Sequence, residues 1–187
     1  MRLHEIITEL FSRDFEPHPD NHWQSLGGGG YTFFVGERQY EVNLKDMPGI
    51  GAPIQRVEFA MRTENGLLSW DITKTGNSGL VLELVAYSLR HEYNSTDVKG
   101  FFFTAKELSR RKLYNVLAQK LAESVGWDLR PDLAEWINYS NEQPYLIVEQ
   151  DFAKRLDKAR HEKGDAAKQT PLVRQPDTFG SIPFRFD

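Results

Sequence analysis

The sequence predicts an α/β fold in which helices flank a mixed, mostly antiparallel sheet of six or seven strands. Two hairpin signals, between residue 31 and about residue 72, predict four consecutive antiparallel strands. Residues 67–127 then read as strand, glycine turn, helix, strand and helix, with almost no spacer. A strand that enters a helix through a glycine turn leaves free backbone N–H groups at the helix N-terminus, and these can bind an anion. This segment therefore predicts both the fold and a candidate site.

Length and composition limit the classes of protein to which the chain can belong. Its 187 residues with 40% hydrophobic content can bury one sizeable core, and we expect one main domain over residues 1–150. A formal net charge of −4 argues against a protein that coats duplex nucleic acid. Cysteine is absent, which excludes disulfides and thiolate nucleophiles. No apolar run approaches the roughly 20 residues of a membrane span, and the first ten residues do not resemble a signal peptide.

The first half of the chain predicts strands after a short helix. Residues 2–12 have the apolar spacing of an amphipathic helix. Prolines and four consecutive glycines follow, and we expect a mobile loop over about residues 12–30. YTFFVGERQYEVNL predicts a hairpin that turns at Gly36 and Glu37. QRVEFAMR and GLLSWDIT predict a second hairpin around Asn65-Gly66, because Asn-Gly is a strong turn signal.

The second half predicts helices that alternate with strands. Residues 78–92 have a wide apolar stripe, which predicts a helix buried against the sheet. GFFFTA is almost wholly apolar and predicts a central strand covered on both faces. A helix over residues 106–124 can end at Gly126. WDLRPD and PYLIVEQ predict the last strands, on either side of a short helix, and residues 151–187 predict a polar helix followed by an extended tail.

This order of elements resembles that of the Gcn5-related N-acetyltransferase (GNAT) superfamily: four meandering strands, a glycine turn into a helix, a buried strand and a helix bearing Leu-Tyr. The combination of MRLHEIITEL, ITKTGNSGLVLELVAYSL and FFFTAKELSRRKLY is also similar to a family of uncharacterised bacteriophage proteins. The resemblance covers roughly residues 1–130. It implies a GNAT-like fold and a phage-encoded, acyl-coenzyme A dependent N-acyltransferase or a degenerate relative of one.

The resemblance also implies a binding site for acetyl-coenzyme A, formed by Thr75, Gly76, Asn77, Ser78 and Gly79. The superfamily cradles the pyrophosphate with Arg/Gln-x-x-Gly-x-Gly/Ala, and this chain keeps only the central glycine, with Thr73 and Ser78 at the outer positions. Backbone amides supply most of such a cradle, so these departures do not forbid phosphate binding. The structural alternative is that the glycines let the chain turn while Ser78 caps the helix.

Two residues are candidates for catalysis. Tyr114 stands where the superfamily often keeps a tyrosine that protonates the departing coenzyme A thiolate. Glu58, in the strand QRVEFAMR, is the candidate general base, because a carboxylate beside an acyl pocket can relay a proton from an amine. Each has a structural alternative: Tyr114 as an aromatic at the edge of the core, and Glu58 as a solvated strand carboxylate.

Two further clusters carry polar groups. Acidic and histidine residues crowd residues 14–22, but no rigid element fixes their geometry, and we expect no metal site. Arg110 and Arg111 lie near the start of a predicted helix and can bind nucleic acid or an acidic partner, or can simply form a solvated face.

The basic cluster keeps a second function open, that of a non-catalytic phage protein. Such a protein would be a virion component or a binder that inhibits a host factor. We expect it in the host cytoplasm or associated with the virion, without a membrane as partner. A host protein is the expected partner, and the basic cluster leaves nucleic acid open as an alternative. The sequence names neither the acceptor substrate nor the host partner.

Overall fold

The computed structural model of the chain describes residues 15–47, 53–63, 65–69, 78–106, 108–138 and 140–167. Its strands are β1 (Gln24–Gly27), β2 (Gly30–Val35), β3 (Arg38–Asp46), β4 (Ile54–Arg62), β5 (Leu68–Ser69), β6 (Gly100–Ala105), β7 (Asp128–Leu129) and β8 (Gln143–Val148). Its helices are the 3-10 helix η1 (Pro19–Asn21) and the α-helices α2 (Ser78–Ser95), α3 (Leu108–Val125), α4 (Pro131–Ile137) and α5 (Gln150–Ala167). The helix predicted over residues 2–12 and the tail beyond residue 167 lie outside the described residues.

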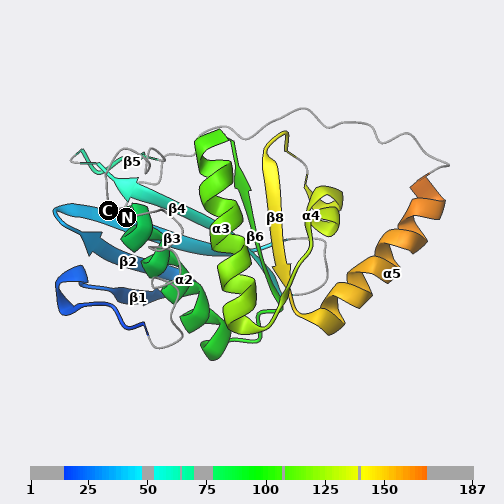
Figure 1. The fold of residues 1–187 in the computed structure, drawn as a ribbon, viewed down its shortest axis with the longest axis horizontal. Coiled ribbons are helices and arrows are strands. Elements are labelled where there is room, and N and C mark those ends of the chain that lie inside the picture. Colours follow the sequence, from blue (N-terminus) through cyan, green and yellow to red (C-terminus); the bar gives the residue numbers. More distant parts are fainter. Residues whose placement is uncertain are drawn as a thin grey trace.

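The strands form one sheet in the order β1-β2-β3-β4-β6-β8-β7, and the short β5 pairs with β4 outside this path (Figure 1). Neighbours are antiparallel except for β4 and β6, which are parallel. A parallel pair needs a crossover, and α2 supplies it between these two strands. The predicted fold class, a mixed and mostly antiparallel sheet flanked by helices, is confirmed.

Two hydrophobic cores lie on opposite faces of the sheet. The first face packs against α2 and α3, and its core joins side chains from β2, β3, β4, β6 and β8 to those of the two helices. The second core lies over the start of β4 and over β6 and β8, beneath α4 and the first turns of α5, where Phe152 and Leu156 are buried. β6 is therefore covered on both faces, which explains why GFFFTA is apolar at nearly every position.

The predicted turns are confirmed where the structure describes them. Val35 pairs with Arg38, which leaves Gly36 and Glu37 as the two-residue turn, and Gly36 has a φ of 61°. β4 and β5 form the second antiparallel hairpin. α3 ends at Val125 and Gly126 follows with a φ of 71°, the left-handed conformation that glycine adopts most readily.

The segment before Gly30 differs from the predicted loop, since it contains η1 and strand β1. All four residues of β1 are exposed, so its sequence lacks the alternation of apolar and polar residues that indicates a strand. The glycines of this segment instead let its backbone approach β3 closely. Gly29 accepts a hydrogen bond from the Leu44 backbone N–H at 2.9 Å, and a Cβ at Gly29 would meet the Leu44 carbonyl oxygen at 2.8 Å.

One buried carboxyl in α2 makes stability depend on pH. The Glu83 side chain is 4% exposed, and burial raises its pKa to about 7, an effect that the positive charge of Arg90 opposes. Both Arg90 terminal nitrogens are buried and have no hydrogen-bond partner in the described part of the chain. The ionised form of Glu83 is thus poorly solvated in the folded state.

We expect the free energy of unfolding to fall as the pH rises from about 4.5, the usual pKa of a glutamate, to about 7. The reason is that the folded protein binds the Glu83 proton over this range and the unfolded chain releases it. Glu83→Gln should remove this loss, so its stability relative to wild type should rise by about 1 to 3 kcal/mol across the range. Urea unfolding at several pH values measures this difference in stability between Glu83→Gln and wild type. Glu37→Gln, in the exposed turn, is the control. Parallel pH curves for wild type and Glu83→Gln would contradict the assignment.

Candidate functional site

The sheet opens where β4 and β6 diverge. The two strands pair in parallel over only three residue pairs, from Ile54↔Gly100 to Arg56↔Phe102. β4 nevertheless continues to Arg62 and β6 to Ala105, and Figure 1 shows their arrowheads pointing in different directions. Within the described chain, residues 57–60 of β4 and 103–105 of β6 have no ladder partner on the edges that face this opening. Free backbone N–H and C=O groups on such edges can bind an extended ligand.

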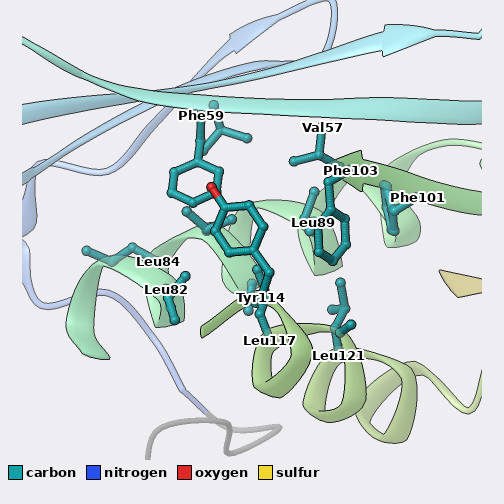
Figure 2. Packing of buried hydrophobic residues seen from close by; sticks show 14 of the residues in the cluster. Val57, Phe59, Leu82, Leu84, Leu89, Phe101, Phe103, Tyr114, Leu117 and Leu121 are labelled. Atoms are coloured by element: carbon teal, nitrogen blue, oxygen red, sulfur yellow. The ribbon is translucent and has the colours of Figure 1, made fainter. Parts of the chain in front are cut away.

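Tyr114 of α3 lies at this divergence. Its ring centroid is 5.4 Å from that of Phe59 on β4 and 5.7 Å from that of Phe103 on β6. Figure 2 shows the ring reaching out from α3 with its hydroxyl group directed toward the strand that carries Phe59. The side chain is 6% exposed and belongs to the first core. The tyrosine thus spans the two strands just where they separate.

The N-terminus of α2 lies at the same end of the sheet as this opening. The helix ends at Ser95, four residues before β6 begins, and its 18 residues extend roughly 27 Å back along the sheet. Its first turn therefore lies toward the carboxyl ends of β4 and β6 (Figure 1). Ser78 and Gly79 are the first two residues of the helix. Thr75, Gly76 and Asn77, the other predicted cofactor residues, lie outside the described residues.

Glu58 does not share this site with Tyr114. Successive side chains of a strand point to opposite faces, and Phe59 points toward Tyr114. Glu58 accordingly lies on the other face, where its carboxylate oxygens are 2.8 Å from Lys45 Nζ and 3.4 Å from Arg56 Nε. The two predicted catalytic residues are therefore on opposite sides of the sheet, and Glu58 forms a surface ion pair in this structure.

Arg111 borders a second hollow, a cavity of about 330 Å³ between α3, β7 and β8. Its backbone carbonyl accepts a hydrogen bond of 2.8 Å from the Tyr145 hydroxyl, and its Nε is buried without a partner in the described chain. Lys112 also lines the cavity, and no carboxylate does. Burial raises the pKa of Tyr145, and the charge of Arg111 opposes that rise. The side chain of Arg110 lies outside the described atoms, so the structure does not test its predicted role.

Another hollow, larger than the one beside Arg111, was not predicted. It is a cavity of about 660 Å³ between the glycine turn after β1, the end of β3 and the C-terminal half of α2. Tyr31 and Glu92 meet there, joined by a hydrogen bond of 2.5 Å from the tyrosine hydroxyl to the carboxylate. The two residues are 61 positions apart, and neither belongs to a recognisable motif. A polar contact at this separation leaves no periodic signal, so the sequence could not reveal it.

Among the described residues, no group of three or more histidine, cysteine, aspartate or glutamate side chains is placed to hold a metal ion. In the loop with the acidic and histidine cluster, His18 instead caps η1 by accepting from the Asp20 backbone N–H at 3.3 Å. None of the described helices has the length and apolar character needed to cross a membrane.

Comparison with models of protein families, with curated proteins and with solved structures finds no match to this chain. The candidate sites are therefore supported by their geometry alone.

Proposed function

We propose that this protein is an acyl-coenzyme A dependent N-acyltransferase with a GNAT-like fold, or a degenerate relative of one, encoded by a phage. The element order supports the proposal: meandering antiparallel strands precede a helix, a buried strand and a helix that bears Leu113-Tyr114. The observation that carries it is the divergence of β4 and β6 around Tyr114.

The opening suits an extended ligand that contains amides. The pantetheine arm of coenzyme A is such a ligand, and the edges of β4 and β6 that have no ladder partner among the described residues offer it backbone hydrogen bonds. The first turn of α2, with Ser78 and Gly79, offers N–H groups that have no partner within the helix, and the positive end of a helix dipole, to a pyrophosphate. These two features lie at one end of the sheet, as a single bound molecule would require.

In the proposed reaction the acyl group comes from the thioester of acetyl-coenzyme A, and the protein contributes a proton donor. The Tyr114 hydroxyl can protonate a leaving thiolate as its charge develops. Glu58 cannot take the proton of an incoming amine at this point, because it lies on the opposite face. The amine would therefore have to lose its proton to solvent or to a group outside the described residues.

A first prediction concerns binding at the α2 N-terminus. Acetyl-coenzyme A should raise the melting temperature of the wild type by mass action. In Ser78→Asp the new carboxylate favours the helix dipole, so the protein without ligand should melt no lower than wild type. The same carboxylate repels a pyrophosphate, so the ligand-induced rise should vanish.

The matched control is Ser95→Asp, which adds the same charge at the other end of the same helix. It should keep the ligand-induced rise even though its own melting temperature falls. If millimolar acetyl-coenzyme A leaves the wild-type melting temperature unchanged, the cofactor proposal fails. An equal rise in Ser78→Asp would place the ligand elsewhere.

A second prediction concerns Tyr114. Tyr114→Phe removes only a hydroxyl, so it should cost at most about 1 kcal/mol of stability. Thiol release from acetyl-coenzyme A, a surrogate for turnover, should fall on the order of 10²-fold. Leu117→Ala, one turn further along α3, is the comparison variant for loss of core packing, since Leu117 is 1% exposed. It should cost about 2 to 5 kcal/mol through the cavity it leaves. Full activity in Tyr114→Phe would remove this residue from the chemistry.

The cavity beside Arg111 favours a second candidate function, a binder of an acidic partner. Its charged lining residues are Arg111 and Lys112, and the buried Arg111 Nε has a hydrogen to donate. A carboxylate from a partner protein could accept it. This candidate corresponds to the virion component or host-factor binder that the sequence left open.

Glutarate, a small dicarboxylate, can probe this cavity by NMR titration. The backbone amide signals of Leu129, Gln143 and Tyr145 should shift, and Lys112→Glu should abolish the shifts because it reverses an exposed charge beside the cavity. Lys158→Glu is the control, since this lysine is 79% exposed on α5. Shifts of equal size in all three proteins would indicate non-specific charge effects and would count against the binder.

A further inference from the structure

The unpredicted cavity is lined by a buried polar network from three distant parts of the chain. Tyr31 comes from β2, Gln55 from the start of β4, and His91 and Glu92 from the C-terminal half of α2. The glycine turn at residues 27–29 and the end of β3 form the rest of the wall. Gly29 lies so close to Leu44 that a side chain there would disturb this wall.

The Glu92 carboxylate is the centre of the network. It is 5% exposed, and Tyr31, which is 2% exposed, donates its hydroxyl hydrogen to one carboxylate oxygen at 2.5 Å. The Gln55 amide donates to the other oxygen at 3.2 Å. A distance as short as that to Tyr31 is typical of a hydroxyl that donates to an ionised carboxylate. Burial and this negative neighbour hold the pKa of Tyr31 well above its usual range, so the phenol keeps its proton.

The carboxylate has no countercharge in the described part of the chain. Both of its donors are neutral, and no ion pair includes Glu92. An ionised carboxylate offers about four acceptor positions, and these donors fill two. A buried charge without a cation is costly, which makes the site favourable for one.

A second group lacks a partner at the same place. The Gln55 amide nitrogen must face Glu92, because a carboxylate can only accept hydrogen bonds. This fixes the amide orientation and leaves the Gln55 carbonyl oxygen buried without a partner among the described residues. Gln55 therefore adds a second unfilled acceptor next to the charged one of Glu92.

The other walls suit an organic cation. Tyr31 lines the cavity while its ring is stacked on Trp23 at 5.5 Å, and His91 stands edge-on to that ring at 5.7 Å. At the rim, Asp46 adds a carboxylate, whereas the Lys45 ammonium is already paired with Glu58 at 2.8 Å. The charge around the cavity is therefore net negative.

We propose that this cavity is a binding site for a small primary amine, held as its ammonium ion by the Glu92 carboxylate beside Gln55. An ammonium has three donors and no acceptor, which matches the unfilled acceptors. A metal ion is the weaker match, because no metal-type cluster of ligands exists in the described chain. The ligand is thus an alkyl ammonium compound with a short apolar chain.

This site is separate from the proposed acyltransferase site. Gln55 and Phe59 point to the same face of β4 but are four residues apart, about 13 Å along a strand. An amine held by Glu92 would thus lie too far from Tyr114 to receive an acyl group there. The inference does not depend on the proposed function, and either can fail alone.

The test is an NMR titration of the full chain with n-butylammonium chloride, compared with n-butanol and with sodium chloride at equal ionic strength. Backbone amide signals at Tyr31, Gln55 and Glu92 should shift in a saturable manner with butylammonium only. Glu92→Gln, which preserves shape and removes the charge, should weaken binding at least tenfold. Glu123→Gln, an exposed carboxylate on α3, should bind as wild type does.

A second variant covers the case in which Glu92→Gln does not fold. Ser95 lies exposed at the cavity, and Ser95→Arg places a cation there without touching the buried network. It should also weaken butylammonium binding at least tenfold. The proposal is overturned if butanol and butylammonium give the same shifts, if calcium chloride alone produces them, or if Ser95→Arg binds as tightly as wild type.

Discussion

The three parallel residue pairs between β4 and β6 form the junction on which the rest of the structure depends. They join a meander of antiparallel strands to a second group that contains β6, β8 and β7. Because the junction is parallel, the chain must cross over, and α2 is placed on the first face of the sheet as a consequence. Because the junction is short, the strands beyond it separate, and Tyr114 occupies the point of separation.

α2 connects the two candidate sites without belonging wholly to either. Its first residues lie toward the open end of the sheet, and Glu92 lies in its last turn at the closed end. Between them the helix buries Leu84, Val85 and Leu89 in the first core. A rigid, well-packed helix of this kind fixes the separation of the two sites, which argues for two independent ligands rather than one long one.

The sequence predicted the elements whose side chains repeat with a helical or strand period. GFFFTA as a central strand and the turn at Gly36 follow from local chemistry alone. The position of Glu58 could also have been inferred, since its two neighbours in the strand, Val57 and Phe59, are apolar and share one face, which leaves Glu58 on the other. The meeting of Tyr31 with Glu92 could not, because it depends on how α2 lies across the sheet, which no local pattern encodes.

The two edge strands of the sheet affect how readily the protein can self-associate. A long, regular edge strand invites another chain to add to it. Among the described strands one edge is β1, whose four residues contain a register shift between Ser25 and Gly27, and the other is β7, only two residues long. The irregular glycine turn therefore does more than shape a cavity wall: it limits how far a second copy could extend the sheet at that edge.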